Sequence, residues 1–247
     1  MLLAIDIGNT NVKLGLFDGN SLRKLSIAMT ECNSPGEKIG DFIRDNAAAV
    51  DAVIVSSVVP DLTGQIISIV RPHVDVEPHI VSHRTNTGVS FSVPYPERVG
   101  ADRITAAAWA YHHFGAPAAV IDFGTATTIS VVGQGGVFKG GTIIPGLRTM
   151  ALSLNKLTAA LPLIALDIPS AALGKDTREA IISGIVYGTA GAVSRIIFEI
   201  EREIGYNLKI AVTGGNLSLI EPCLERVDVV EPDLGLKGMK MIYERMI

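Results

Sequence analysis

Two short stretches decide the fold: residues 4–10 read AIDIGNT, and residues 120–126 read VIDFGTA. Each begins as an apolar run, reaches an aspartate (Asp6 or Asp122), and has a glycine two residues later. The two aspartates are 116 residues apart (122 − 6), close to half of the 247-residue chain. An internal repeat outranks any single motif as a fold signal. It predicts a chain built of two similar halves.

The residues around both stretches predict the same series of elements. Asp18-Gly19 is a two-residue hairpin signal after the first copy, and residues 133–136 (GQGG) predict a turn after the second. We therefore expect an α/β fold with domains at 1–116 and 117–247. In the first half we expect strands at 2–7, 11–17, 21–28, 52–59 and 80–81, helices from Pro35 to about Ala49, at 60–70 and at 100–114, and a loop at 82–99. In the second half we expect strands at 118–123, 127–132, 137–144 and 208–213, and helices at 146–160, 176–204 and from about 235.

The composition excludes several classes of protein. Hydrophobic residues make up 48% of the chain, enough apolar surface to exclude disorder. The net charge of −4 argues against a basic face for nucleic acid. The N-terminus lacks a basic segment, and no apolar run approaches the ~20 residues of a membrane span. Cys32 and Cys223 are far apart, which favours reduced thiols. We expect a cytoplasmic protein with no membrane or nucleic-acid partner, whose 25 glycines allow close backbone approach to a ligand.

The first copy of the repeat continues into a dense polar motif, DIGNTNVK at residues 6–13. A carboxylate at the end of a buried strand can hold Mg²⁺, directly or through water. Gly8 lets a phosphate approach the hairpin backbone, and Lys13 can reach a phosphate as a point charge. This combination predicts a phosphate-binding bend.

The second copy, DFGTATT at residues 122–128, offers one carboxylate and three hydroxyls but no basic residue. These groups suit a cation, or a phosphate already paired with metal, better than a bare anion. The P-loop and dinucleotide-binding glycine motifs are both missing from the sequence. Those two modes of nucleotide binding are therefore excluded.

A third motif, GADR at residues 100–103, follows the long loop at an expected helix start. Arg103 can bind a carboxylate or phosphate, and Asp102 can accept a proton from a hydroxyl that attacks phosphorus. Two glycine-rich turns, at 140–146 (GGTIIPG) and 213–216 (TGGN), end strands and open helices. We expect such turns to let the backbone lie against a nucleotide.

Taken together, these motifs resemble type III pantothenate kinases, a family of the actin/hexokinase/Hsp70 superfamily of phosphotransferases. The resemblance runs over essentially the whole chain, in order. It implies two duplicated ribonuclease H-like (actin-like ATPase) domains, each a mixed five-stranded sheet flanked by helices. It also implies transfer of the γ-phosphoryl group of ATP to pantothenate, giving 4′-phosphopantothenate in the first step of coenzyme A biosynthesis.

The resemblance assigns residues as well. It implies Asp102 as the catalytic base, Asp6 near Mg²⁺ through water, and Asp122 as a ligand of K⁺ or NH₄⁺. It also implies a homodimer, for which the 176–204 helix is our choice of interface. The ATP-binding residues would be Asp6, Ile7, Gly8, Asn9, Thr10, Asn11, Val12, Lys13 and Thr125. The pantothenate-binding residues would be Gly100, Ala101, Asp102, Arg103 and Thr177.

One position departs from the family, and two other functions stay open. The family often has a substrate-contacting tyrosine where this chain has Val93, and Tyr95 stands closer to the GADR motif. Another phosphotransferase of the superfamily would share the phosphate motifs but has no need of GADR. A non-catalytic regulatory protein could lose its acids, yet Asp6, Asp102 and Asp122 are all present.

Overall fold

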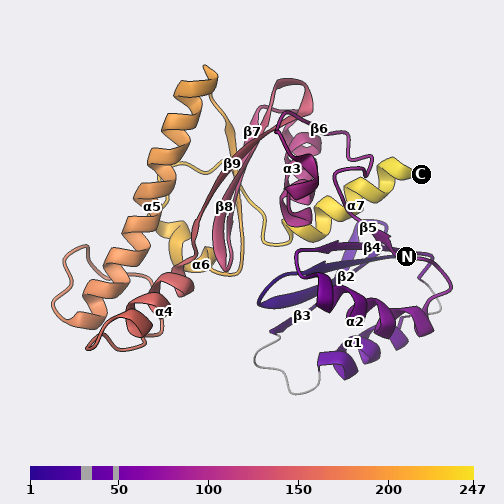
Figure 1. Ribbon diagram of the computed structural model, residues 1–247, viewed down its shortest axis with the longest axis horizontal. Coiled ribbons are helices and arrows are strands. Elements are labelled where there is room, and N and C mark those ends of the chain that lie inside the picture. The colour runs from indigo at the N-terminus through magenta and orange to yellow at the C-terminus, as the bar shows by residue number, and fades with distance from the viewer. Residues whose placement is uncertain (29–34, 47–49) are drawn as a thin grey trace. The chain divides into compact units, whose positions relative to one another are not determined.

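The computed structural model describes residues 1–28, 35–46 and 50–247, which form two compact units (Figure 1). Unit 1 comprises Met1–His113 together with Asp233–Ile247, and unit 2 comprises Phe114–Pro232. The last helix therefore packs with the first half of the chain, whereas the expected division at 116 and 117 assigned it to the second half. The cause is a long-range apolar contact: Leu236, Met239 and Ile242 are buried in one cluster with residues of the first sheet.

Unit 1 is a mixed sheet with helices on both faces. Its strands run in the order β3-β2-β1-β4-β5, with β1 antiparallel to β2 and parallel to β4. One face packs against α1 and α2, and the other against α3 and α7. Its elements are β1 (Leu2–Ile7), β2 (Asn11–Asp18), β3 (Ser21–Ala28), α1 (Pro35–Arg44), β4 (Ala52–Ser57), α2 (Pro60–Val70), β5 (His79–Ile80), β6 (Ser90–Phe91), α3 (Ala101–Phe114) and α7 (Leu234–Met246), with short 3₁₀ turns at Arg71–His73 and Pro96–Arg98.

Unit 2 repeats the topology. Five strands of the six-stranded second sheet run in the order β9-β8-β7-β10-β11, with β7 antiparallel to β8 and parallel to β10. This correspondence confirms the duplicated, actin-like fold class. Its elements are β7 (Ala118–Phe123), β8 (Ala126–Gly133), β9 (Val137–Pro145), α4 (Leu147–Leu157), α5 (Thr177–Ile204), β10 (Lys209–Thr213), α6 (Leu217–Ile220) and β11 (Val229–Val230), with 3₁₀ turns at Gln134–Gly136 and Glu221–Cys223.

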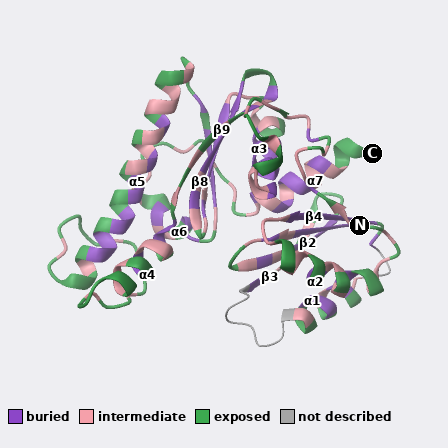
Figure 2. Ribbon diagram, in the orientation of Figure 1, coloured by how far each residue is buried: buried purple, intermediate pink, exposed green. Residues whose placement is uncertain are grey.

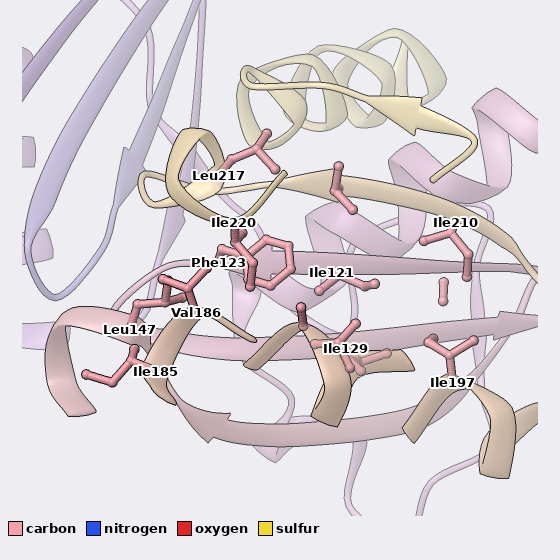
Figure 3. Packing of buried hydrophobic residues seen from close by; sticks show 14 of the residues in the cluster. Ile121, Phe123, Ile129, Leu147, Ile185, Val186, Ile197, Ile210, Leu217 and Ile220 are labelled. Carbon is pink, nitrogen blue, oxygen red and sulfur yellow. The ribbon is translucent and has the colours of Figure 1, made fainter. Parts of the chain in front are cut away.

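The core of unit 2 lies between its sheet and three helices, α4, α5 and α6. Ile121, Phe123 and Ile129 of the sheet meet Val186 of α5 and Leu147 of α4 there (Figure 3). The alternation along β7 and β8 places these residues on one face, as the period of two requires. The first residues of the β7–β8 bend are therefore anchored by a packed core.

Helix α5 is the longest element of the chain, and its ends follow from its caps. The Asp176 carboxylate accepts a hydrogen bond from Glu179 N at 2.7 Å, and the Glu179 carboxylate accepts one from Lys175 N at 2.8 Å. Gly205, in the left-handed region with φ of 80°, ends the helix. By length and composition α5 could cross a membrane, but half of its most apolar stretch is buried inside the protein (Figure 2). A core helix passes the same test.

Two expectations differ from the structure or fall outside it. Helix α1 ends at Arg44 and not near Ala49, because residues 45 and 46 already form a turn. Cys223 is partly buried, forms no disulfide with any described residue, and packs against the core of unit 2. Cys32 lies outside the described residues.

Candidate functional site

Strand β1 ends at a row of polar side chains that crosses three strands of unit 1. Asp6 is paired with Lys13 of β2 and with Ser56 of β4. Earlier residues of β1 and β4 on the same face, Ala4 and Ile54, are buried against α3 and α7. Because side chains alternate along a strand, Asp6 and Ser56 continue this face beyond its apolar part. A carboxylate, an ammonium group and a hydroxyl are thus neighbours at the end of the sheet.

The bend after β1 is tight. Gly8 N donates to Asn11 O at 3.0 Å, and Asn9 and Thr10 are exposed at the tip. Ile7 and Val12, in contrast, have fully buried side chains in the cluster that faces α1 and α2. Of the residues expected to bind ATP, these two can contribute only main-chain atoms. The alternation of inward and outward residues along the two strands already predicts that these two side chains face the core.

Helix α7 begins beside Asp6. A Cβ added to Gly235, in the first turn of α7, would lie 3.4 Å from Asp6 Oδ2. The N-terminal end of a helix carries partial positive charge and favours a nearby carboxylate. The first turn of α7 therefore adds partial positive charge beside the Asp6 carboxylate.

The GADR motif forms the start of α3, beside the end of β4. Asp102 Oδ1 accepts a hydrogen bond from Arg103 N at 2.7 Å. A Cβ on Gly100 would lie 2.5 Å from the same oxygen and 3.4 Å from Val58 Cγ1, so glycine leaves room for the carboxylate. Burial raises the pKa of Asp102 above its ordinary 3.8, while the hydrogen bond and charge of Arg103 oppose that rise. A carboxylate with a raised pKa is a better proton acceptor than an ordinary one.

In unit 2 the bend after β7 is held by main-chain and amide contacts. Asn216 N donates to Phe123 O, and its side-chain amide donates to Gly124 O, both at 3.0 Å. A Cβ on Gly214 would lie 2.5 Å from Asp122 Oδ1, so the chain closes tightly over this carboxylate. The TGGN motif thus forms a cradle around Asp122.

The other side of the same bend is held by the start of α4. Gly146 N donates to Thr125 O at 3.1 Å, and Thr149 Oγ1 donates to the same oxygen at 2.6 Å. A Cβ on Gly146 would lie 2.3 Å from Gly124 O. Thr149 was not expected at the site, because a threonine inside a helix carries no sequence signal of this role.

Thr177, expected to contact pantothenate, begins α5 and lines a cavity of about 700 Å³ within unit 2. The cavity lies between α4, the segment after it, and the first turns of α5, and its walls are mainly apolar. Thr177, Thr158 and Ser153 are its hydroxyl-bearing residues. A ligand there would meet apolar surface with a few hydroxyl groups.

Two further observations bear on the expected ligands. Tyr95 is 56% exposed, and its ring stacks under Arg98, whose Cζ lies 4.5 Å from the ring centre.

Within residues 1–28, 35–46 and 50–247, no three His, Cys, Asp or Glu side chains gather into a metal-binding cluster. A single carboxylate such as Asp6 suits Mg²⁺, which keeps several waters and is shared with phosphate oxygens.

Comparison with known proteins identifies relatives over the full chain. The family model described as type III pantothenate kinase matches residues 2–199. A type III pantothenate kinase from Agathobacter rectalis is 37% identical over 253 residues, covering 99% of this chain and 97% of that protein. The enzyme of the same name from Thermomicrobium roseum is 38% identical, covering 100% of this chain and 98% of that protein.

A solved structure supports the fold alone. The activator of 2-hydroxyisocaproyl-CoA dehydratase from Clostridium difficile, with bound ADPNP, superimposes with a TM-score of 0.55 at 13% identity. The match covers 99% of this chain and 95% of that one. Such a distant likeness confirms the actin-like architecture and assigns no residue a role.

Proposed function

The chain belongs to the type III pantothenate kinase family, and we propose how its residues divide the work of the family's reaction. That reaction is the ATP-dependent phosphorylation of pantothenate to 4′-phosphopantothenate, the first step of coenzyme A biosynthesis. The observation that carries the proposal is the partly buried Asp102 carboxylate beside Arg103 at the start of α3.

Asp102 acts as the general base in this proposal. Its carboxylate takes the proton of the pantothenate hydroxyl as that oxygen bonds to the γ-phosphorus and the bond from phosphorus to ADP breaks. Phosphoryl transfer has a loose transition state, so positioning and charge neutralisation supply most of the acceleration. Arg103 anchors the pantothenate carboxylate through its planar guanidinium group. Thr177 is proposed as a further pantothenate contact.

Asp6 and Lys13 bind the nucleotide phosphates in this proposal. Mg²⁺ would neutralise the developing charge on the phosphates, and Asp6 would hold it through its water shell. Lys13, the strand neighbour of Asp6, adds a positive charge to the same row. Gly8 to Asn11 supply main-chain and side-chain donors at the bend. Thr125, in unit 2, is proposed as a further ATP contact.

Asp122 is proposed to bind a monovalent cation, K⁺ or NH₄⁺. The main chain closes around its carboxylate at Gly214 and Gly124, where added Cβ atoms would lie 2.5 Å and 3.5 Å from Asp122 Oδ1. Carbonyl and carboxylate oxygens are the ligands that such a cation prefers. If Asp122 has this role, activity in a buffer with Na⁺ alone should be lower than in K⁺.

We further propose that the protein is a cytoplasmic homodimer that uses α5 as part of its interface. Tyr187 and Phe198 on α5 are 41% and 54% exposed, although both are large and apolar. Burying them against a second copy would remove this surface from water. Light scattering after gel filtration tests the assembly, and charged substitutions at both positions should yield monomers.

The test of the catalytic assignment is a coupled kinase assay with pantothenate and ATP, with and without K⁺. Asp102→Asn should lower turnover ~10²–10⁴-fold, the usual share of a general base. Asp61→Asn is the matched control, because Asp61 also lies in the first turn of a helix in unit 1. Normal turnover by Asp102→Asn would refute its role. Turnover of another hydroxyl acceptor would favour a different phosphotransferase, and binding of pantothenate without turnover would favour a regulatory protein.

A further inference from the structure

Ser56 stands out among the hydroxyl groups of unit 1. The residue is only 1% exposed, and its Oγ has no hydrogen-bond partner among the residues that the structure describes. A buried hydroxyl without a partner costs stability, because it has lost its hydrogen bonds to water. A residue kept at such a cost calls for an explanation other than packing.

The neighbouring Ser57 provides the contrast. Its side chain points to the opposite face of β4, where Ser57 Oγ accepts a hydrogen bond from Val59 N at 3.1 Å. Thr63 Oγ1, on α2, lies 2.6 Å from the same oxygen. Ser57 is therefore a structural residue that ties the end of β4 to α2.

The neighbours of Ser56 within the sheet point to a single polar partner. The residues two positions before and after Ser56 are Ile54 of β4 and Val58, just beyond its end. On the β5 side the pairing of Val55 with Ile80 continues to Val81, a buried residue of the apolar cluster. On the β1 side the partner in register is Asp6. Of these four neighbours, only Asp6 can form a hydrogen bond through its side chain.

The distance between the strands allows that bond. Adjacent strands lie about 4.8 Å apart, and paired residues present their side chains on the same face. At this spacing a serine hydroxyl and an aspartate carboxylate on paired positions can reach each other when their side-chain bonds rotate toward one another. Because Ser56 is so deeply buried, its hydroxyl can act on a ligand only through a neighbouring side chain.

We propose that Ser56 is a positioning residue: its hydroxyl donates a hydrogen bond to the Asp6 carboxylate and holds it toward the Mg²⁺–ATP complex. This inference rests on the proposed role of Asp6. The hydroxyl occupies one carboxylate oxygen and leaves the other to face the water shell of the metal. The hydrogen bond forms when MgATP binds, and it gives the buried Ser56 hydroxyl the partner that it lacks among the described protein atoms around it.

The test is the binding of ATP, measured by calorimetry without pantothenate, in the presence of Mg²⁺ or of EDTA. Ser56→Ala should weaken binding of MgATP about 10-fold, the size expected for a hydrogen bond to a charged group. Binding of ATP in EDTA should stay within about 2-fold of wild type. The Ser56→Ala protein should be at least as stable in urea as wild type, because no existing bond is lost. Ser57→Ala is the matched control, with lower stability and unchanged MgATP binding.

A double-mutant cycle with Asp6→Asn separates this proposal from the one on which it rests. If Ser56 acts through Asp6, adding Ser56→Ala to Asp6→Asn should weaken MgATP binding by less than about 2-fold more. Additive effects, or wild-type binding by Ser56→Ala, would overturn the role of Ser56. Wild-type MgATP binding by Asp6→Asn would instead overturn the proposed role of Asp6. If the cycle is non-additive but the protein does not phosphorylate pantothenate, the positioning role of Ser56 would be supported and pantothenate would be refuted as the substrate.

Discussion

Gly238 of α7 is the position where one methyl group should disturb both stability and activity. A Cβ there would lie 2.6 Å from the backbone oxygen of Thr105 and 2.8 Å from its Cγ2. Thr105 belongs to α3, so α7 and α3 touch at this point through their backbones. A C···O contact needs about 3.3 Å. The Gly238→Ala variant can therefore be accommodated only if the helices separate by roughly 0.7 Å, the difference between those distances.

The expected loss of stability follows from two opposing effects. Overpacking a buried contact costs about 1–3 kcal/mol, while replacing a helical glycine by alanine returns about 1 kcal/mol. We expect a net loss of about 1 kcal/mol, which lowers the melting temperature by about 2–4 °C in a protein of this size. Differential scanning calorimetry measures it.

Activity should fall as well, because the same two helices begin at the proposed site. The first turn of α7 lies against Asp6, and the first turn of α3 carries Asp102. A misplacement of about 1 Å can lower a rate about 10²-fold, so a smaller shift should lower kcat/KM about 10-fold. The kinase assay with pantothenate and ATP measures this.

The matched control is Gly64→Ala on α2, in the same unit. Gly64 is exposed, and a Cβ there meets no atom of the described residues within 4 Å. This variant should be more stable than wild type by about 0.5–1 kcal/mol, with unchanged activity. If Gly238→Ala is as stable as Gly64→Ala, the close approach of α7 and α3 is not real. If Gly238→Ala is destabilised but fully active, the placement of Asp6 and Asp102 does not depend on the contact between these helices.

Three further variants test single features. Asp102→Asn should raise stability to urea at neutral pH, since burial raises the pKa of the carboxyl and its ionisation opposes folding. That gain should vanish below pH 3.8, and a constant gain would contradict it. Gly214→Ala should lower the free energy of unfolding by about 2 kcal/mol or more in calorimetry, because φ is +111° and the added Cβ meets Asp122. An unchanged melting temperature would show that the bend adjusts freely to the methyl group. Asp176→Ala should cost about 1 kcal/mol as a lost N-cap, and an unchanged melting temperature would contradict it.

The repeat made most of the fold predictable from the sequence. Each copy places an aspartate at the end of a buried strand before a hairpin. The structure has those strands, β1 and β7, inside two sheets that share the order of five strands. Pro60 fixed the start of α2, since proline at the first helical position needs no amide partner. Local signals were sufficient where neighbours in sequence are also neighbours in space.

Long-range packing was less accessible. No signal within residues 233–247 tells which half of the chain the last helix joins, because the choice depends on contacts of Leu236, Met239 and Ile242 with distant strands. The end of α1 was also missed. A run of alanines favours continuation of a helix, yet the chain turns directly after Arg44.

The candidate site was predictable in its charged residues and not in its supporting ones. Asp6, Asp102 and Arg103 belong to motifs that the sequence displays directly. Ser56 lies in an apolar strand where serine carries no signal, and its relation to Asp6 depends on strand register. Asn216 acts through its hydrogen bond to Gly124 O, a contact between residues far apart in sequence. Such roles become visible only when the paired strands and bends are known.

The residues paired with Asp6 on the neighbouring strands differ from those paired with Asp122. This difference bears on the roles of the two aspartates. Asp6 is paired with Lys13 and Ser56, whereas the equivalent partners of Asp122 are Thr128 and Thr213. The first copy thus places an ammonium group beside its carboxylate, which suits an anionic phosphate. At the same positions the second copy supplies hydroxyl oxygens, which suit a cation. If K⁺ activation depends on this difference, Thr128→Lys should make turnover less dependent on K⁺. An unchanged dependence on K⁺ would show that the activating cation does not bind at Asp122.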